Sequence, residues 1–407
     1  MKIVIACDTL GKPNNGTTLA ALNLISHLKE RGHEVRVISP DETTRGKEGY
    51  YVVPKADLGR LLNKALLKNG VSLAKPDEGI VEKAIRGADV VHVLFPFPLA
   101  WMATRIACEH GIPVTAGFHC QAENLTAHLG LMHSRLANHA VYTVFNDRVY
   151  RHCTAIHYPT EFIRQEFLKH VDCSAIPCVI SNGVSERFFN EERSIRLSDK
   201  FTVFCSGRFS SEKAQHILLK AVAMSKYRDN VKVVLAGCGP KEEKLRKLAD
   251  KLGLDCEIRF FERSELPAYL RGADLYVHTA VYEIEAIACM EAIASGLVPV
   301  ICSAKGSATR FFALDGKCLY RKGSVRELTE RIEYFYEHPE ELAKYRKLYA
   351  ESAKCLELDE CMRRMERMLV TAAKGRSAFA HTAEAGYPYP AEAADENGDE
   401  PASAVSY

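Results

Sequence analysis

Short apolar runs alternate with amphipathic stretches along most of the chain. The opening run KIVIACD is followed by a loop that contains glycine and by apolar residues at helical spacing from Leu19 to Leu28, which end before Gly32. A second apolar run, HEVRVI, comes next. A strand, a helix and a second strand in this order form a βαβ unit, which implies a parallel sheet with a right-handed crossover.

The alternation continues and then starts again after a polar interruption. Further strands are predicted in the first half at ADVVHVLFP (88–96), PVTAGFH (113–119), CTAIHYPT (153–160) and PCVISNGV (177–184). The charged segment NEERSIRLSDK (190–200) predicts a link between domains. Beyond it, strands separated by helices are predicted at FTVFCSG, VKVVLAGCG, EIRFF, DLYVHTA and VPVICS.

The last part of the pattern predicts helices from about Val325 to Ala373, with a break at Pro339. We therefore predict an α/β protein with two facing, doubly wound Rossmann-like domains: residues 1–190, and residues 191–376 with the terminal helices. Such sheets bind ligands at the carboxyl ends of their strands. Functional residues are therefore expected directly after strands, in a cleft between the two domains.

Charge modifies this picture at the C-terminal end. The formal net charge is +2, but residues 377–407 contain six acids and no Lys or Arg. Subtracting −6 from +2 leaves +8 for residues 1–376. We predict that the acidic tail is disordered. The basic remainder is compatible with anionic ligands or with an anionic membrane surface.

Cysteine usage and apolar run lengths indicate the compartment. The 14 cysteines are scattered, with no CxxC pair and no Cys/His cluster at zinc spacing, so neither a disulfide framework nor a metal site is predicted. Residues 1–6 lead straight into a strand pattern, unlike a signal peptide, and no run approaches the ~20 apolar residues that span a bilayer. These features predict a cytoplasmic protein.

Two glycine-bearing segments follow the first two strands of the second domain. In SGRFSSEK, Arg208 and Lys213 lie five residues apart, and two converging cations suit a diphosphate. Taken alone, they are better explained as solvated surface cations, but their position at the carboxyl end of a predicted strand favours the diphosphate. In GCGP, Gly237 would let the backbone approach a ligand, although a simple turn between strand and helix explains it as well.

Three carboxylates occur in the otherwise apolar segment VYEIEAIACMEAIASG (281–296). Glu283 is expected just before a helix, and Glu291 two turns into it. The helix N-terminus would attract an anion, and a carboxylate in the helix could accept hydrogen bonds from two hydroxyls, as a ribose offers. The alternative is that Glu291 caps a neighbouring helix or pairs with a basic residue.

Together these motifs resemble glycosyltransferase family 4. SGRFSSEK, the two glutamates separated by seven residues, and GLVPVI match that family in order and spacing. NNGTTLAALNLISHLKERGHEVRVI is similar to its first glycine loop and helix, ISNGV is similar to the stretch before its second domain, and the likeness covers roughly residues 1–370. The resemblance implies the two-domain GT-B architecture and a retaining, metal-independent enzyme that uses a nucleotide-sugar donor and no cofactor.

The resemblance also implies roles for individual residues. Arg208 and Lys213 would bind the donor diphosphate, Glu291 the ribose hydroxyls and Glu283 the transferred sugar. The predicted catalytic residues are His119, Arg208, Lys213 and Glu283. The predicted donor-binding residues are Gly16, Gly207, Arg208, Lys213, Gly237, Glu283, Ile284, Glu285, Ala286 and Glu291.

Some of these assignments are weakened by the sequence itself. His119, which matches a histidine near the donor sugar, is equally explained as a core histidine at a strand end. The family's usual Gly-Phe-Gly after the first glutamate is replaced by Ile284, Glu285 and Ala286. Those glycines let main-chain N–H groups approach the sugar, so the replacement leaves the donor identity open. Glu285 either selects a polar group of the ligand or stabilises the helix dipole.

The acceptor is expected at the first domain. Trp101, Glu123 and Asn124 are its candidate contacts, in segments rich in aromatic and basic residues that suit a membrane interface or, equally, a buried aromatic cluster with solvated bases. GFHCQAEN, IHYPTEFI and GSATRFFALD resemble bacterial enzymes that glucosylate diacylglycerol. We therefore predict transfer of a hexose, with UDP-glucose or a similar donor, to a membrane lipid at the inner face of the plasma membrane.

Other functions stay open at this point. The acceptor could be a soluble sugar or a polysaccharide. The same architecture also serves nucleotide-sugar epimerases, which the combination of Arg208, Lys213 and the paired glutamates disfavours. A non-catalytic nucleotide-sugar sensor is compatible with the altered segment 284–286. A nucleic-acid partner is not predicted, because no basic run with interleaved aromatic residues is present.

Overall fold

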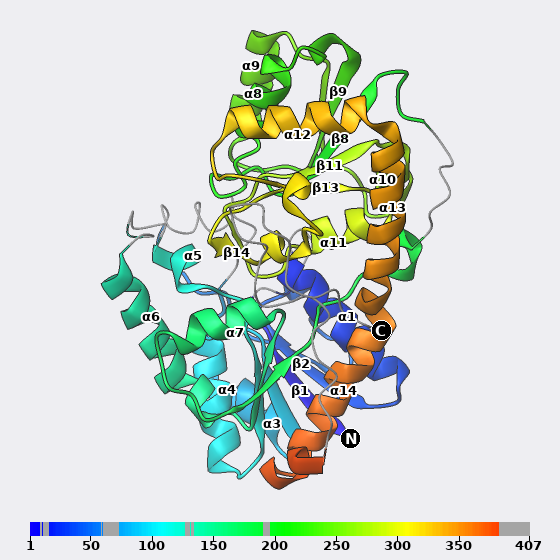
Figure 1. Ribbon diagram of the computed structural model, residues 1–407. Helices are drawn as coiled ribbons and strands as arrows, with labels where there is room; N and C mark the ends of the chain where they lie inside the picture. Colours follow the sequence, from blue (N-terminus) through cyan, green and yellow to red (C-terminus); the bar gives the residue numbers. More distant parts are fainter. Residues whose placement is uncertain are drawn as a thin grey trace. The chain divides into compact units, whose positions relative to one another are not determined.

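The computed structural model describes residues 1–8, 10, 16–57, 59, 73–126, 131, 134–189 and 196–381. Contacts divide the chain into two units, each of which is described by itself (Figure 1). Unit 1 contains Met1–Asn182 and residues 359–381, and unit 2 contains Gly183–Leu358. Most of the predicted acidic tail (382–407) and part of the predicted link (190–195) lie outside the described residues.

Unit 1 is built on one parallel sheet. Its described residues form seven strands in the order β3-β2-β1-β4-β5-β6-β7. The strands are β1 (Lys2–Ala6), β2 (Glu34–Ser39), β3 (Tyr50–Val52), β4 (Val90–Val93), β5 (Val114–Gly117), β6 (Ala155–Tyr158) and β7 (Ile176–Val179). The helices are α1 (Gly16–Glu30), α3 (Glu78–Ile85), α4 (Pro98–Glu109), α5 (Ala122–Thr126), α6 (Arg135–Arg148), α7 (Glu161–Leu168) and α14 (Leu358–Ala373).

Burial explains why the strands of unit 1 read as apolar runs rather than as alternating patterns. Every residue of β4, β5 and β6 is buried, as expected for central strands of a parallel sheet that is covered on both faces. At the edge of the sheet, β7 is only half-buried along its whole length. The apolar runs therefore predicted these strands by their composition.

Unit 2 repeats this plan. Its larger described sheet has six parallel strands in the order β10-β9-β8-β11-β13-β15. They are β8 (Phe201–Ser206), β9 (Val231–Ala236), β10 (Cys256–Arg259), β11 (Leu275–His278), β13 (Pro299–Cys302) and β15 (Leu319–Tyr320). The helices are α8 (His216–Met224), α9 (Glu242–Leu252), α10 (Leu266–Gly272), α11 (Ile287–Ala294), α12 (Val325–Glu337) and α13 (Pro339–Ala353). A small two-stranded sheet joins β12 (Tyr282–Glu283) to β14 (Gly306–Ser307).

The predicted α/β class with two doubly wound sheets is confirmed. In each sheet the strand order reverses beside the first strand, so that β1 neighbours β4 in unit 1 and β8 neighbours β11 in unit 2. Ligands of such sheets bind where the order reverses, at the carboxyl ends of the strands. Functional residues are therefore expected at these two places, one in each unit.

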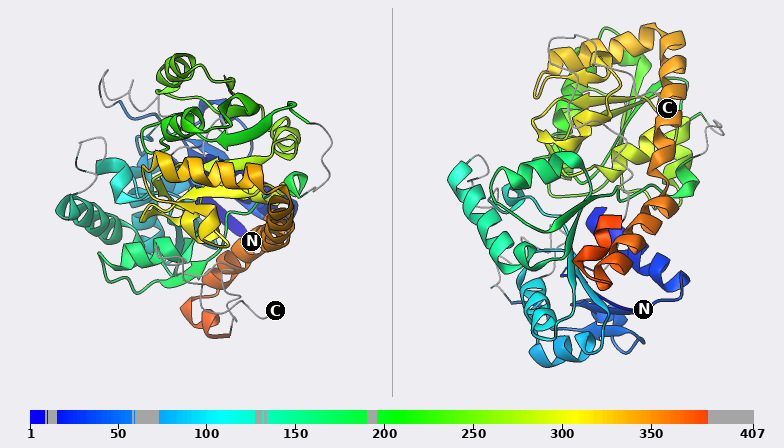
Figure 2. Two further views of the ribbon diagram at one scale, coloured as in Figure 1. Left: turned by 45° about the horizontal axis from the view of Figure 1, so that its top comes forward. Right: turned by 60° about the horizontal axis from the view of Figure 1, so that its bottom comes forward.

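The division of the chain differs from the predicted boundary at residues 190/191. The units meet between Asn182 and Gly183, and α14, which was expected in the second domain, belongs to unit 1. Figure 2 shows α14 beside α1. Glu366 of α14 accepts hydrogen bonds from His27 (3.2 Å) and His33 (3.0 Å), and these contacts join helices from opposite ends of the chain.

No described helix has both the length and the apolar character needed to cross a bilayer.

Candidate active site

The carboxyl end of β8 is held by its neighbour β9 through direct backbone packing. A Cβ atom on Gly237 would lie 2.1 Å from the carbonyl oxygen of Gly207, and one on Gly239 would lie 2.6 Å from that of Phe209. Phe209 also donates its backbone N–H to the carbonyl of Cys238 (2.9 Å). The glycines of GCGP are therefore needed for this contact between two loops, which fixes the backbone that carries Arg208.

The segment after Arg208 is joined to the segment that follows β11. The backbone N–H of Val281 donates to the carbonyl of Glu212 (2.8 Å), and the hydroxyl of Thr279 donates to the carbonyl of Lys213 (2.6 Å). Since β8 and β11 are neighbours in the sheet, their two following loops form one surface. The structure thus brings the predicted residues Lys213 and Glu283 together.

Lys213 forms an ion pair with Glu283, whose carboxylate accepts a hydrogen bond from the ammonium. Glu283, which was expected just before a helix, lies in the short strand β12, which pairs with β14. Tyr282 packs over Gly306 so closely that a Cβ there would lie 2.6 Å from its ring. The small sheet therefore fixes the backbone at Glu283 before α11 begins.

A histidine that sequence reasoning missed completes this cluster. His278 is the last residue of β11, is almost completely buried, and places its Nε2 3.2 Å from Oε1 of Glu283. Burial raises the pKa of Glu283, but Lys213 and His278 more than offset that effect and lower the pKa to about 2. Glu283 is therefore an ionised carboxylate at neutral pH. A histidine within a buried strand that ends at the sheet's reversal point was the available signal.

Glu291 lies in the second turn of α11, close to arginines. Its side chain is buried and its Oε1 lies 2.5 Å from a terminal nitrogen of Arg263. Burial raises the pKa of Glu291, while Arg263 and Arg187 act in the opposite direction. The guanidinium groups of Arg187 (5.6 Å) and Arg263 (5.5 Å) also lie over the ring of Phe188. The pairing with a base, which the sequence left open, is therefore present.

The altered segment 284–286 has a specific backbone consequence. Ala286 adopts a left-handed conformation (φ +68°) directly before α11, where the resembling family has glycine. A side chain at such a position is strained by about 1–2 kcal/mol. Glu285 beside it is buried. Helix α11 therefore begins at Ile287, directly after the chain turns at Ala286.

In unit 1, Gly16 and His119 lie at the predicted positions. Gly16 is the first residue of α1, after the undescribed residues 11–15. His119 follows β5 and packs on Gly117, where a Cβ would lie 2.7 Å from its ring. Its ring centroid lies 5.3 Å from that of His157. Burial, followed by the neighbouring His157, holds the pKa of His119 well below the usual value, so His119 is neutral.

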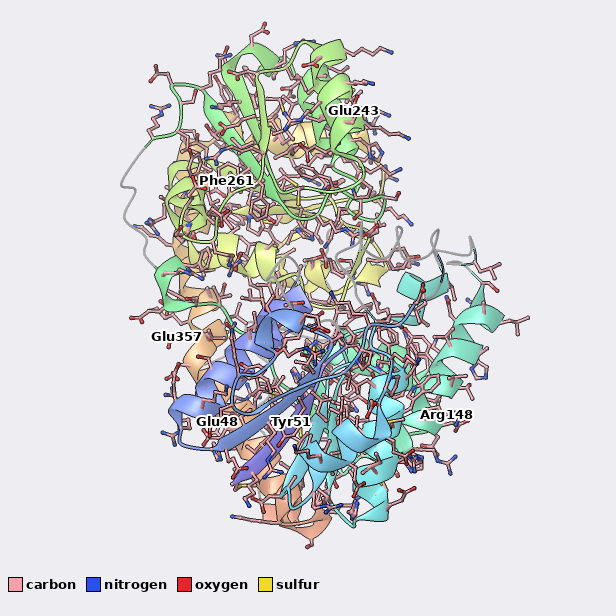
Figure 3. All side chains as sticks on the ribbon, turned by 180° about the vertical axis from the view of Figure 1, so that it is seen from behind. Glu48, Tyr51, Arg148, Glu243, Phe261 and Glu357 are labelled. Atoms are coloured by element: carbon pink, nitrogen blue, oxygen red, sulfur yellow. The ribbon has the colours of Figure 1, made fainter. Side chains whose placement is uncertain are left out.

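The candidate acceptor contacts are partly engaged within unit 1. The indole N–H of Trp101 donates to the carbonyl of Pro96 (2.8 Å), and Arg148, labelled in Figure 3, lies over the indole ring at 5.6 Å. Glu123 accepts hydrogen bonds from Asn138 (3.3 Å) and Tyr142 (2.9 Å). The side chain of Asn124 lies outside the described residues. Glu123 therefore has a structural role in joining α5 to α6.

Within the described part of the chain, no group of three His, Cys, Asp or Glu side chains is arranged to hold a metal ion. At the ends of β8 and β11 the structure instead pairs Lys213 with a fixed carboxylate, Glu283, and a second cation, Arg208, follows β8 in the sequence. Such a set can bind an anion through its cations and a hydroxyl through its carboxylate.

Comparison with known proteins identifies relatives of both halves of the chain. Residues 14–188 match the sequence model described as "Glycosyltransferase Family 4", and residues 187–353 match "Glycosyl transferases group 1". Alpha-monoglucosyldiacylglycerol synthase of Acholeplasma laidlawii is 25% identical over 377 residues, 85% of this chain and 94% of the relative. The protein of the same name from Streptococcus pneumoniae is 24% identical over 322 residues, 74% of this chain and 70% of the relative.

Two further proteins extend the comparison. A GDP-mannose-dependent alpha-mannosyltransferase of Mycolicibacterium smegmatis is 27% identical over 312 residues, 74% of this chain and 79% of the relative. The crystal structure of Anabaena HepE in complex with UDP and glucose matches 90% of this chain and 99% of its own with a TM-score of 0.70, and at 17% identity it supports the fold alone. The two matches follow one another along the chain, which therefore carries a glycosyltransferase family 4 domain followed by a glycosyl transferases group 1 domain and is a glycosyltransferase.

Proposed function

We propose that this glycosyltransferase transfers a glucosyl group from UDP-glucose to the hydroxyl of a membrane lipid such as diacylglycerol, with retention and without a metal ion. The observation that carries the proposal is the cluster of Lys213, His278 and Glu283 where the strand order of the unit 2 sheet reverses. The names of the relatives from Acholeplasma and Streptococcus support the lipid acceptor. The same names support a glucosyl donor, and the Anabaena protein, which shares the fold, binds UDP and glucose.

In this proposal unit 2 binds the donor. Arg208 and Lys213 bind the diphosphate, because two cations at the end of β8 offset the charge that accumulates on the leaving group. Glu283 accepts a hydrogen bond from the transferred sugar, and Glu291 from the ribose. Backbone N–H groups at Ala286 and Ile287, at the start of α11, lie beside the sugar in place of those of the usual glycines.

The reaction follows from these charges. The bond between the anomeric carbon and the phosphate oxygen breaks, and the acceptor oxygen bonds to the same face of that carbon. The acceptor's hydroxyl proton passes to the departing phosphate, so the charges balance without an enzyme nucleophile. Glu283 is engaged by Lys213 and His278, which suits it to hold a hydroxyl rather than to attack carbon. His119, neutral in unit 1, serves as a hydrogen-bonding neighbour of the sugar.

The acceptor side is assigned to unit 1. Trp101 and Arg148 present an aromatic ring and a cation on neighbouring helices, a combination that suits the boundary between lipid and water. We assign the protein to the cytoplasmic surface of a membrane, bound peripherally.

A panel of UDP-, GDP- and ADP-sugars tests the proposal. Nucleotide release is measured with and without diacylglycerol vesicles, in excess EDTA. Release from UDP-glucose that rises only with vesicles is the expected result. Loss of nucleotide release in EDTA would contradict the metal-free reaction. A release rate that is the same with and without vesicles would contradict the lipid acceptor. Binding without any release would contradict turnover itself.

GDP-mannose is the second candidate donor, because the relative from Mycolicibacterium is a GDP-mannose-dependent mannosyltransferase of similar identity. The same panel separates the two donors: release from GDP-mannose alone would replace glucosyl by mannosyl transfer. The acceptor arm of the experiment is unaffected by which donor is used.

A further inference from the structure

The carboxylate of Glu283 belongs to a longer hydrogen-bonded chain that crosses two strands. Residues two apart in a strand lie on the same face, so Tyr276 and His278 of β11 point in one direction. The hydroxyl of Tyr276 lies 3.4 Å from Nδ1 of His278, and the hydroxyl of Ser206, the last residue of β8, lies 3.1 Å from that of Tyr276. The order Ser206, Tyr276, His278, Glu283 therefore runs from the end of one strand to the candidate sugar contact.

The direction of the hydrogen bonds in this chain follows from what each group can do. A carboxylate only accepts, so the Nε2 of His278 must carry the hydrogen that faces Glu283. In the neutral ring Nδ1 is then the acceptor, and the hydroxyl of Tyr276 can donate either to it (3.4 Å) or to the carbonyl of Ser206 (3.4 Å). Ser206 can donate in turn to the oxygen of Tyr276. The tautomer of His278 with its hydrogen on Nε2 thus fits both neighbours, Glu283 and Tyr276. Tyr276 is fully buried in β11, and Glu283 lies in the strand β12.

The two hydrogen bonds on Glu283 end on the same oxygen. Lys213 and His278 both donate to Oε1, and Oε2 receives no hydrogen bond from any residue that the structure describes. The side chain of Glu283 keeps 12% of its surface exposed, whereas that of His278 keeps 3%. The carboxylate is therefore held through Oε1, and Oε2 is available to a group that comes from outside the protein.

We propose that His278 is a positioning residue, held in one tautomer by Tyr276 and Ser206, that orients Glu283 so that Oε2 accepts a hydrogen bond from a hydroxyl of the transferred sugar. This inference rests on the proposed function, because it takes the donor sugar as the ligand of Glu283. Lys213 alone does not fix the carboxylate, since an ammonium on a flexible stem acts as a point charge with rotatable donors. The ring of His278 comes from a buried strand and supplies the direction.

Two substitutions at one position separate hydrogen bonding from packing. His278→Phe keeps a ring in the strand but removes the donor to Glu283, whereas His278→Gln keeps a side-chain N–H of similar reach. We expect His278→Phe to lower kcat/KM for UDP-glucose by about 10- to 100-fold, the effect of losing a hydrogen bond to a charged group. His278→Gln should restore most of that loss. The inhibition constant of UDP, which lacks the sugar, should stay within about threefold of wild type in both.

The control is His338→Phe. His338 is a half-buried histidine of the same unit between α12 and α13, and its Nδ1 lies 2.8 Å from the carbonyl of Tyr334. Its replacement should leave the kinetics with the donor unchanged. If His278→Phe does not fold, Tyr276→Phe is measured in its place. That variant removes the group that fixes the tautomer, and a smaller loss of about three- to tenfold in kcat/KM is expected with UDP inhibition unchanged.

A double variant decides the route by which His278 acts. In a Glu283→Gln background, His278→Phe should have no further effect on kcat/KM, because both changes remove the same interaction. Additive losses, equal losses in UDP inhibition and turnover, or wild-type turnover in His278→Phe would each overturn the inference. Wild-type turnover in Glu283→Gln would instead remove the sugar contact from the proposed function. If the donor panel selects another sugar nucleotide, that donor and its free nucleotide replace UDP-glucose and UDP.

Discussion

Glu283 keeps its charge in a buried place because two partners lie beside it. Burial raises its pKa, yet Lys213 and His278 bring the pKa down from 4.5 to about 2. Because the folded pKa lies below the unfolded one, the carboxylate stabilises the fold fully above pH 4.5, and that contribution is lost as the pH falls toward 2. Its ionisation therefore does not limit activity near neutral pH.

Lys213→Ala removes the stronger of the two interactions that lower the pKa of Glu283. Turnover of the donor is expected to fall by about 100-fold or more, since a cation at the leaving group is lost. The pKa of Glu283 should rise, so the variant should be destabilised most near pH 7 and much less near pH 3. Thermal unfolding at both pH values, with turnover at pH 7, measures the two effects. Lys220→Ala, which removes an exposed lysine of α8, is the control. Equal destabilisation at both pH values would contradict the assignment.

Asp8, just beyond β1, should affect the pH dependence of stability in the opposite direction to Glu283. It is almost completely buried, and burial raises its pKa from 3.8 to about 7, although backbone N–H groups of Ala74, Leu99 and Asp8 itself act in the opposite direction. The fold therefore disfavours its charge, and the penalty grows as the pH rises from about 4 to 7 and is constant above that. Each pKa unit corresponds to ~1.4 kcal/mol.

Asp8→Asn should consequently raise stability at pH 8, by up to about 4 kcal/mol, and change it little at pH 4. Urea unfolding at the two pH values is the measurement. Asp77→Asn serves for comparison, because Asp77 caps α3 by accepting a hydrogen bond from the backbone of Ile80 (2.9 Å). A loss of stability in Asp8→Asn at pH 8 would show that the charged form is favoured by the fold.

Single residues show where sequence reasoning reached its limit. Lys213 and Glu283 could be placed at one edge of a sheet because both follow strands, and the structure pairs them. The contacts of His278 with Glu283 and of Arg263 with Glu291 could not be predicted. Neither depends on periodicity; both depend on which loops meet after the sheet has formed.

Among the elements, the start of α11 is the point of strain. Ala286 is forced to a positive φ, which glycine adopts without strain. Ala286→Gly should therefore stabilise the protein by about 0.5–1 kcal/mol even though glycine also gains freedom in the unfolded chain. Ala292→Gly, within the same helix, should destabilise it by about 1 kcal/mol. Urea midpoints of the two variants should move in opposite directions, and a shared direction would contradict the strain argument.

Most strands of both main sheets could be predicted because buried parallel strands are apolar throughout, but the short edge strands β3 and β15 were not predicted. The pairing of β12 with β14 could not, since two-residue strands carry no periodicity. The bend at Ala286 could not be predicted for a related reason. The residues around it suit a helix, whereas the chain turns where the small sheet of β12 and β14 meets α11.

For the whole molecule, α14 decides how the chain is divided. Glu366 is approached by His27, His33 and Arg31 from the region of α1, and its own side chain is mostly buried. Glu366→Gln should lower the stability of unit 1 by about 2 kcal/mol, because three donors lose a charged acceptor. Glu360→Gln removes a half-exposed glutamate on the same helix that pairs with Arg363, and it should change the stability by less than about 0.5 kcal/mol. Differential scanning calorimetry compares the two, and equal effects would show that Glu366 does not secure the helix.

The return of α14 to unit 1 also has a consequence for synthesis. The buried face of this helix (Cys361, Met362, Met365, Met368 and Leu369) is part of the core of unit 1, yet it is translated after the whole of unit 2. Domains generally begin to fold from the N-terminus as they leave the ribosome. In this chain unit 1 emerges first, and the apolar surface that α14 covers stays exposed until unit 2 has been synthesised. A nascent chain of this protein therefore offers chaperones a binding surface that disappears only at the final helix.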